Sequence, residues 1–308
     1  MAGRAARGLI IPHRPRRAGN PRLTHVSFGR RRLRDRQGGR GAVAAARARA
    51  DDDAAAGNVG DKRTALDLAD DLAGWQPPPG VTAACIFAAV ARLADCAADP
   101  AGSARVNVTG TLALAERLLV RGIYVLFLST NQVFDGTTPH VPADAPTCPV
   151  SEYGKQKART EAALRAHIER GAPAAILRLA KVVSRETALL RDWTTALAAG
   201  KPIRAFHDMT MAPAPVDTVT QAIETLMSER AAGVFQLTGP RDVAYAEVGL
   251  LLADRLQVDK SLLTSVSVAS AGLPKGVAPR NTTLDSSALR ERYGIVAPDA
   301  WDVLALFL

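Results

Sequence analysis

Short apolar runs alternate with amphipathic stretches from about residue 64 onward. The runs Val81–Ala89 and Tyr124–Ser129 have the length and continuity of strands that a parallel sheet buries on both faces. Between them, Asp99-Pro100 opens a stretch whose apolar residues recur at helical spacing as far as Leu119. Strands that alternate with helices predict an α/β fold with a doubly wound parallel sheet, and a ligand crevice at the carboxyl ends of its strands.

The first sixty residues lack this pattern. Residues 1–50 hold fourteen arginines against one acidic residue, Asp35, a net charge of +13, so the other 258 residues carry −4 of the total +9. Three interpretations compete: a basic arm for nucleic acid, an organellar targeting peptide, or an aberrant N-terminus that is miscalled, frame-shifted or poorly ordered. Aromatic residues for base stacking are almost absent, and prolines interrupt any amphipathic helix. We favour the third, because Arg/Ala/Gly/Pro-rich text without periodicity is typical of off-frame translation.

Cysteine content and hydropathy restrict the remaining classes. Cys85, Cys96 and Cys148 are odd in number and have no metal-ligand spacing, so the sequence predicts neither a disulfide framework nor a metal site. No apolar run reaches the ~18–20 residues that a bilayer span requires. We therefore expect a cytoplasmic protein without membrane or nucleic-acid partners.

Candidate chemistry lies where the strand 124–129 ends. The segment 153–168 is predicted to be helical, so Tyr153 and Lys157, four residues apart, share one face. A neighbouring ammonium lowers the pKa of a phenol from its usual ~10 towards neutrality, which suits a general acid. A hydroxyl from Thr130 could hold a carbonyl oxygen against that phenol. Such a pair also arises by chance, but its place on the helix after a Ser-Thr strand end, 23 residues from Thr130, favours a functional pair.

Several motifs along the chain point to one family. They are Leu-Asp-Leu-Ala-Asp at 66–70, Val-Asn-Val-Thr-Gly-Thr at 106–111, Leu-Ser-Thr-Asn-Gln-Val-Phe-Asp-Gly at 128–136, Tyr-Gly-Lys-Gln-Lys at 153–157 and Pro-Arg-Asn-Thr-Thr-Leu-Asp at 279–285. From about Ala65 onward the chain resembles the extended short-chain dehydrogenase/reductases, and within them the dTDP-4-dehydrorhamnose reductase (RmlD-like) sugar-nucleotide group. The resemblance covers about four fifths of the sequence.

This resemblance implies a Rossmann-like core at 61–177 and a smaller substrate lobe at 178–308, with 211–238 rejoining the core. It further implies reduction of a 4-keto-6-deoxy nucleotide sugar by NADPH or NADH, as in dTDP-rhamnose biosynthesis, with a homodimer as a possible assembly. Tyr153 would protonate the keto oxygen, Lys157 would tune that phenol and bind the nicotinamide ribose, and Thr130 would bind the keto oxygen. The implied cofactor residues are Asp67, Leu68, Ala88, Ala89, Asn107 and Lys157, and the implied substrate residues are Ser129, Asn131, Val133, Arg178 and Arg280.

The chain departs from the family pattern in its phosphate-binding loop. The family places a glycine-rich turn between its first strand and helix, so that the pyrophosphate lies at a helix N-terminus. The two glycine-containing candidates, 38–41 and 57–60, follow no convincing strand and open no apolar helix. A non-catalytic binding subunit of the same fold therefore remains an alternative, as does an epimerase or dehydratase.

The substrate side departs from the pattern as well. Arg178-Leu-Ala-Lys-Val-Val-Ser184 stands where the reductases have Thr-Ser-Trp after the arginine, and Asn131 stands where an aspartate is usual. Ala278 occupies the place of an arginine, with Arg280 close by. These differences bear on the identity of the sugar more than on the class of reaction.

Overall fold

The computed structural model describes residues 27–28, 65–87, 89–272 and 278–305. Its main sheet has four parallel strands, and their order is β10 (Gly233–Leu237), β5 (Ala174–Leu179), β4 (Tyr124–Thr130) and β3 (Ala83–Ile86). Nearly every residue of these strands is buried, as the apolar runs predict. The strand predicted at Val81–Ala89 is shorter than expected.

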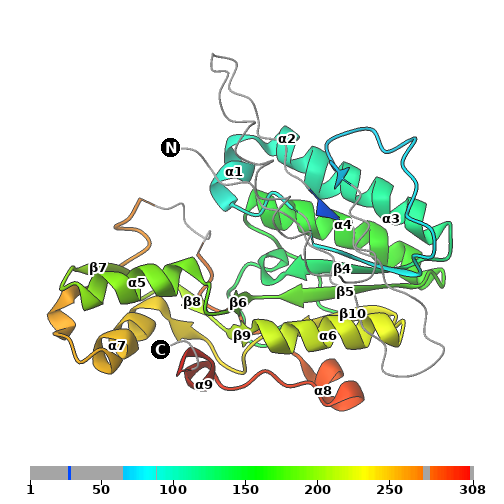
Figure 1. Ribbon diagram of the computed structural model, residues 1–308. Coiled ribbons are helices and arrows are strands. Elements are labelled where there is room, and N and C mark those ends of the chain that lie inside the picture. Colours follow the sequence, from blue (N-terminus) through cyan, green and yellow to red (C-terminus); the bar gives the residue numbers. More distant parts are fainter. Residues whose placement is uncertain (1–26, 29–64, 88, 273–277, 306–308) are drawn as a thin grey trace, which may run out of the picture.

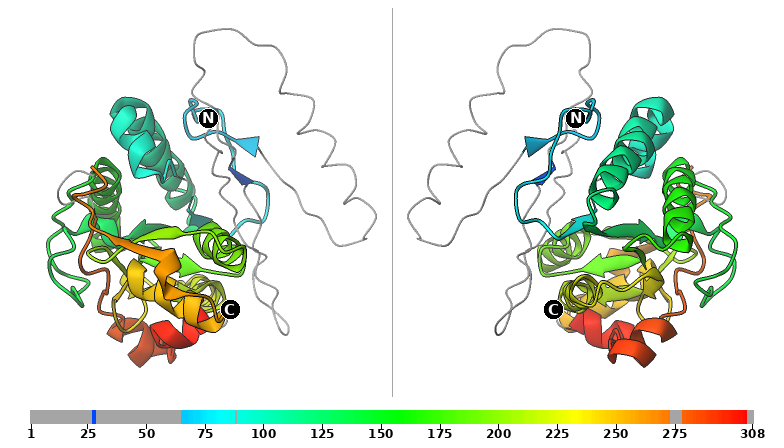
Figure 2. Two further views of the ribbon diagram at one scale, coloured as in Figure 1. Left: turned by 90° about the vertical axis from the view of Figure 1, so that its left-hand side faces the viewer. Right: turned by 90° about the vertical axis from the view of Figure 1, so that its right-hand side faces the viewer.

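Helices cover both faces of this sheet, which confirms the doubly wound α/β fold (Figures 1 and 2). One face carries α1 (Leu93–Ala98), α2 (Pro100–Ala104), the π-helical turn η2 (Arg105–Gly110), α3 (Thr111–Leu119) and α4 (Glu152–Glu169). The other carries α6 (Val216–Ser228) and α8 (Ser287–Tyr293). The core between them is the larger hydrophobic cluster of the described chain.

The start of α4 is fixed by local chemistry. Ser151 is its N-cap and accepts a hydrogen bond from the Gly154 amide at 3.1 Å. The preceding turn, η3 (Asn131–Val133), follows β4 directly, and Thr130 caps it by accepting from the Gln132 amide. A Cβ on Gly154 would lie 2.1 Å from the Gln132 carbonyl oxygen, so only glycine permits α4 to begin this close to the end of β4.

A second hydrophobic cluster lies in the C-terminal half, around Leu190, Leu197, Ile203 and Leu252. The elements of this half that lie outside the main sheet and its covering helices are β6 (Lys181–Val183), α5 (Ala188–Ala198), β7 (Ile203–Phe206), β8 (Thr210–Met211), β9 (Pro213–Pro215), β11 (Val243–Ala244), α7 (Tyr245–Arg255), η4 (Lys260–Leu262), β12 (Leu263–Val266) and α9 (Ala300–Ala305). Three two-stranded sheets, β6–β9, β7–β12 and β8–β11, join them. From this half, β10 returns to the main sheet beside β5.

One short strand lies inside the arginine-rich segment, where the sequence predicted none. Ser27–Phe28 (β1) pairs in parallel with Ala65–Leu66 (β2). The rest of residues 1–60, with the glycine clusters at 38–41 and 57–60, lies outside the described residues. Among those that are described, no helix has the length and apolar character of a membrane span.

Candidate active site

The structure brings Lys157 and Tyr153 to the carboxyl end of β4. Lys157 is 2% exposed, and its Nζ donates a hydrogen bond of 2.8 Å to the carbonyl oxygen of Leu128, two residues before the strand ends at Thr130. Tyr153 lies one turn earlier on α4, with its ring centroid 6.0 Å from that Nζ. The three residues that the sequence singled out thus gather at one edge of the sheet.

Burial dominates the electrostatics of Lys157. Its Nζ lies 4.3 Å from the centroid of the Phe127 ring, a cation–π contact in a water-excluded position. Desolvation lowers the pKa of Lys157 to about 8, although the charges of Glu161 and Cys85 act in the opposite direction. The ammonium therefore begins to lose its proton within the range in which enzymes are assayed.

The pKa of Tyr153 moves against the prediction. Burial raises it above the usual value for a phenol, with a smaller contribution from Cys96, so the expected lowering by Lys157 is wrong for this geometry. The physical reason is that desolvation dominates for this phenol, whose ring centre lies 6.0 Å from the ammonium. The result keeps the phenol protonated near neutral pH, which is the state that a proton donor requires.

Two hydroxyl groups lie at the end of β4. Thr130 Oγ1 accepts from the Gln132 amide at 3.2 Å and lies 3.4 Å from Asn131 Oδ1. Side chains alternate along a strand, so Ser129 shares a face with Phe127, the face on which Lys157 lies. The Ser129 hydroxyl is buried and has no hydrogen-bond partner among the described residues. An unsatisfied buried hydroxyl beside Lys157 is a ready contact for a polar ligand.

Asn107 is hydrogen-bonded to α4, and its side-chain amide is not exposed. Its Oδ1 accepts from the Val90 amide at 2.8 Å, and its Nδ2 donates to the Val90 carbonyl at 3.0 Å and to Gln156 Oε1 at 2.7 Å. Thr160 of α4 donates to the Asn107 carbonyl at 2.9 Å. Both amide N–H groups are used, so Asn107 supports the helix and leaves no donor for the cofactor that it was expected to bind.

Asp67 and Leu68, which were expected to bind the cofactor, lie beside a shallow hollow of about 320 Å³. Leu68 lines it together with Arg105, Thr109 and Gly110, while Asp67 accepts from the Ala69 amide at 2.9 Å. A Cβ on Gly110 would lie 1.8 Å from the Leu68 carbonyl oxygen, so the loop after β2 packs directly on η2. Ala89 is buried, and Ala88 lies outside the described residues.

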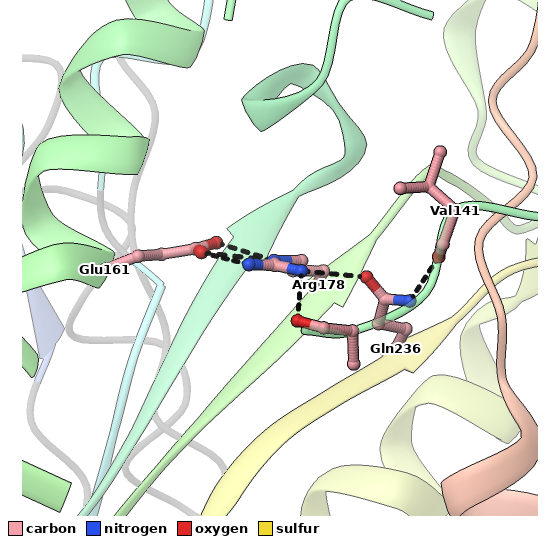
Figure 3. A network of polar contacts seen from close by, with 5 residues as sticks. Val141, Glu161, Arg178 and Gln236 are labelled. Atoms are coloured by element: carbon pink, nitrogen blue, oxygen red, sulfur yellow. Dashed lines mark hydrogen bonds and ion pairs between the residues drawn. The ribbon is translucent and has the colours of Figure 1, made fainter. Parts of the chain in front are cut away.

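Two residues expected to bind substrate are buried instead. Arg178 is 0% exposed because it lies in β5, inside the sheet, and its guanidinium binds Glu161, Gln236 and the Ala143 carbonyl (Figure 3). Val133 is also 0% exposed, within a hydrophobic cluster that includes Phe134. The structure does not bring either side chain to the site. A family motif places a residue in the chain but does not say which way its side chain points.

Asn131 and Arg280 remain accessible. Asn131 is half-buried next to Thr130, and Arg280 is exposed on a strap of chain, residues 279–285, that lies against the loop after η3. The Asn281 amide donates to the Gly136 carbonyl at 2.9 Å. Gly136 has φ +73°, and a Cβ there would lie 2.5 Å from Pro279, so glycine is required at this crossing. The backbone on both sides of Arg280 is therefore held.

Sequence reasoning missed two residues beside the site. Glu161 is fully buried on the face of α4 that carries Lys157, and an acidic residue on a buried helix face is the signal that could have found it. Lys181 opens β6, two residues beyond Leu179, which pairs with Thr130. Lys181 is half-buried, its pKa is lowered by burial, and it forms no ion pair with a described residue.

A second hollow belongs elsewhere. It measures about 450 Å³ and lies between α4 and residues 147–149, where Lys155 and Arg159 line it. These residues are on the exposed side of α4, whereas Lys157 faces the sheet. We do not assign this hollow to the candidate site.

Comparison with known proteins agrees with the motifs. Residues 37–307 match the family described as RmlD substrate binding domain. A dTDP-4-dehydrorhamnose reductase of Burkholderia thailandensis is 30% identical over 243 residues, which cover 72% of this chain and 78% of that protein. The probable low-salt glycan biosynthesis reductase Agl14 of Haloferax volcanii is 29% identical, over 68% of this chain and 71% of that protein. The methionine adenosyltransferase 2 subunit beta of Bos taurus is 25% identical, over 64% and 60%.

Solved structures share the fold at lower identity. The dTDP-4-dehydrorhamnose reductase of Bacillus anthracis, in complex with NADP, superposes with a TM-score of 0.68 at 15% identity and covers 80% of this chain and 89% of that one. The UDP-glucose 4-epimerase of Thermotoga maritima, with UDP-glucose, gives 0.63 at 22% identity, over 73% and 75%. At these identities the likeness concerns the fold alone, and it agrees with a Rossmann-like architecture.

Proposed function

The chain belongs to the RmlD substrate binding domain family, and we propose that it uses NADPH or NADH to reduce a 4-keto-6-deoxy sugar carried on a nucleotide. The observation that carries this proposal is the arrangement at the end of β4. There, Lys157 is held on the Leu128 carbonyl with Tyr153 one turn away, and the Ser129 hydroxyl is buried without a partner. The 30% identity to a dTDP-4-dehydrorhamnose reductase supports the same reaction class.

Each side chain has a separate task in this proposal. Tyr153, kept protonated by its burial, donates the phenol proton to the keto oxygen as that oxygen gains charge. Thr130, at the very end of β4, offers its hydroxyl to the same oxygen. Lys157 places a positive charge next to the phenol, which stabilises the phenolate left after the transfer. When bound, the nicotinamide supplies the hydride.

The described residues fit the nicotinamide end of such a cofactor. Lys157 uses one of its three N–H donors on the Leu128 carbonyl, so it retains donors for ribose hydroxyls. The Ser129 hydroxyl has no hydrogen-bond partner among the described residues and is free to bind the cofactor. At the other end, the hollow lined by Leu68 and Arg105 suits an adenine. Residues for the pyrophosphate are not among these, and the glycine clusters considered for that role lie outside the described part of the chain.

The direct test is turnover with defined substrates. The full-length protein is incubated with NADPH or NADH and a dTDP-4-keto-6-deoxyhexose, and absorbance at 340 nm is followed. We expect oxidation that depends on the sugar, with one new sugar hydroxyl formed per cofactor oxidised. Cofactor that neither binds at millimolar concentration nor is oxidised would contradict the proposal.

A non-catalytic subunit of this fold is the second candidate. The 25% identity to methionine adenosyltransferase 2 subunit beta, a protein named as a subunit, favours it. It predicts that the chain binds NADPH, detected as a change in cofactor fluorescence, without oxidising it in the presence of any keto sugar. An epimerase would also give no net oxidation, but it would convert the sugar, which product analysis detects.

The cellular setting is part of the proposal. None of the three cysteines, all within the described residues, forms a disulfide, which supports a reducing compartment such as the cytoplasm. A homodimer is expected for the purified protein. Cell fractionation tests the location, and sedimentation velocity tests the assembly.

A further inference from the structure

A fully buried ion pair connects α4 to the main sheet. Glu161 and Arg178 have side chains that are 1% and 0% exposed, and Arg178 Nη2 lies 2.7 Å from Glu161 Oε2. Arg178 Nε also donates to both carboxylate oxygens at 3.1 Å, so the guanidinium grips the carboxylate with two adjacent nitrogens (Figure 3). It is the only ion pair with both partners buried among the described residues.

Stability alone does not account for such a pair. Moving two charges out of water costs several kcal/mol each, and apolar replacements of similar volume are often as stable or more so. What the fork of Arg178 provides is geometry, because a planar guanidinium that binds one carboxylate through two nitrogens fixes both distance and orientation. The pair therefore determines where α4 lies on the sheet.

The second anchor of α4 is Lys157. Glu161 follows it by four residues, so both side chains leave the same face of the helix. Lys157 binds the Leu128 carbonyl of β4, and Glu161 binds Arg178 of the neighbouring strand β5. Leu128 pairs with Leu177, the residue before Arg178, so the two anchors lie side by side across the sheet. Two anchors on adjacent strands fix the rotation of α4 about its axis.

The far side of Arg178 is braced as well. Its Nη1 donates to Gln236 Oε1 of β10 and to the Ala143 carbonyl, both at 3.0 Å. Gln236 Nε2 in turn donates to the Val141 carbonyl at 2.8 Å (Figure 3). The same nitrogen donates to the Asp285 carbonyl at 3.1 Å. The guanidinium cannot shift away from β10 without breaking the bond to Gln236, so the partner of Glu161 is held in place.

We propose that Glu161 and Arg178 form a positioning pair that sets the rotation of α4, and thereby holds Tyr153 and Lys157 at the carboxyl edge of β4 in their working geometry. Neither residue contacts the reacting atoms; both act through Lys157 and Tyr153. The inference rests on the proposed function for its kinetic consequences, although the geometry of Lys157 can be measured without turnover.

The pKa of Lys157 is a readout of the Glu161 charge that a change in fold stability alone would not alter. The titratable or charged groups that face Lys157 among the described residues are Cys85 of β3, and Tyr153 and Glu161 of its own helix. Arg178 of β5 lies behind Glu161. Removing the Glu161 charge removes the main interaction that favours the ammonium, so the pKa of Lys157 must fall below about 8.

The experiment combines three variants with two measurements. Glu161→Gln removes the charge, Arg178→Lys keeps a charge without the fork, and the double variant Glu161→Gln/Arg178→Met leaves no unpaired buried charge and so protects folding. The titration of Lys157 is followed by NMR of its ¹³Cε, and kcat and KM are measured for NADPH oxidation. Glu169→Gln, an exposed acid on the same helix, is the matched control.

The expected results differ between the variants. Glu161→Gln lowers the titration midpoint of Lys157 by about 0.5 pH unit or more. Arg178→Lys lowers kcat at least about 10-fold with little change in KM, because misplacing an acid slows chemistry more than binding. The double variant melts within a few degrees of the wild type yet shows the same kinetic loss, and Glu169→Gln matches the wild type throughout.

Two results would overturn the inference. They are an unchanged Lys157 midpoint in Glu161→Gln, and wild-type kcat in a folded Arg178→Lys or double variant. A wild-type protein that oxidises no NADPH would instead count against the proposed function. In that case the titration of Lys157 still decides whether the pair acts on this lysine.

Discussion

Replacing Gly154 with alanine should move the proposed acid without touching it. A Cβ at this position would lie 2.1 Å from the Gln132 carbonyl oxygen and 3.1 Å from the Ser151 hydroxyl that caps α4. Ordinary contact requires at least about 3.4 Å, so α4 or the turn η3 must shift by about 1 Å. Tyr153 precedes Gly154 and Thr130 caps that turn, so either shift changes the geometry of the site.

The expected effect is large on chemistry and moderate on stability. A displacement of about 1 Å can cost about 10²-fold in rate, so we expect kcat to fall by about that factor. Overpacking of this kind destabilises by about 1–3 kcal/mol, measured by urea unfolding. Gly74→Ala is the matched control, because a Cβ there meets nothing within 4 Å. A Gly154→Ala protein with wild-type kcat and wild-type stability would refute the reasoning.

Three further predictions concern other parts of the site. Burial lowers the pKa of Lys157 to about 8, so the buried ammonium destabilises the folded state below that pH. Between about pH 8 and 10.5, the free energy of unfolding of the wild type should therefore rise relative to that of Lys157→Met. Over the same range, activity should decline as the ammonium is lost. Parallel urea titrations and a pH–rate profile check both signs. Asn107→Leu, which strands the polar groups of Val90 and Gln156, should destabilise by about 2–4 kcal/mol in urea. Lys181→Met should raise the KM for the anionic nucleotide sugar several-fold with unchanged melting temperature, and exposed Lys155→Met should leave it unchanged.

The sequence predicted the central elements because their signals are local. The run at 124–129 is apolar throughout and became β4, and the stretch from 153 became α4, with Tyr153 and Lys157 on the turns nearest the strand end. In each case the hydrophobic pattern of the segment is that of either a buried strand or an amphipathic helix, and each of these has one layer to occupy in an α/β fold.

The failures arose where burial decides the role of a residue. Arg178 follows a family motif, but only the structure shows that Glu161 and Gln236, distant in sequence, surround its guanidinium. The motif around Val133 suggested a residue that binds substrate, yet its side chain packs in a buried hydrophobic cluster. The predicted direction of the Tyr153 pKa shift was wrong for the same reason. Desolvation depends on packing in three dimensions, which the spacing of residues along one helix does not reveal.

The central claim is that Tyr153 donates a proton to a keto sugar, and comparing Tyr153→Phe with Tyr293→Phe tests it most directly. Tyr293 lies on α8, where its ring packs near Phe235, so its variant controls for the loss of a phenol elsewhere. With NADPH and a dTDP-4-keto-6-deoxyhexose, the account predicts a kcat about 10²–10⁴-fold below the wild type for Tyr153→Phe and wild-type turnover for the control. A Tyr153→Phe protein that reduces the sugar at the wild-type rate would contradict it.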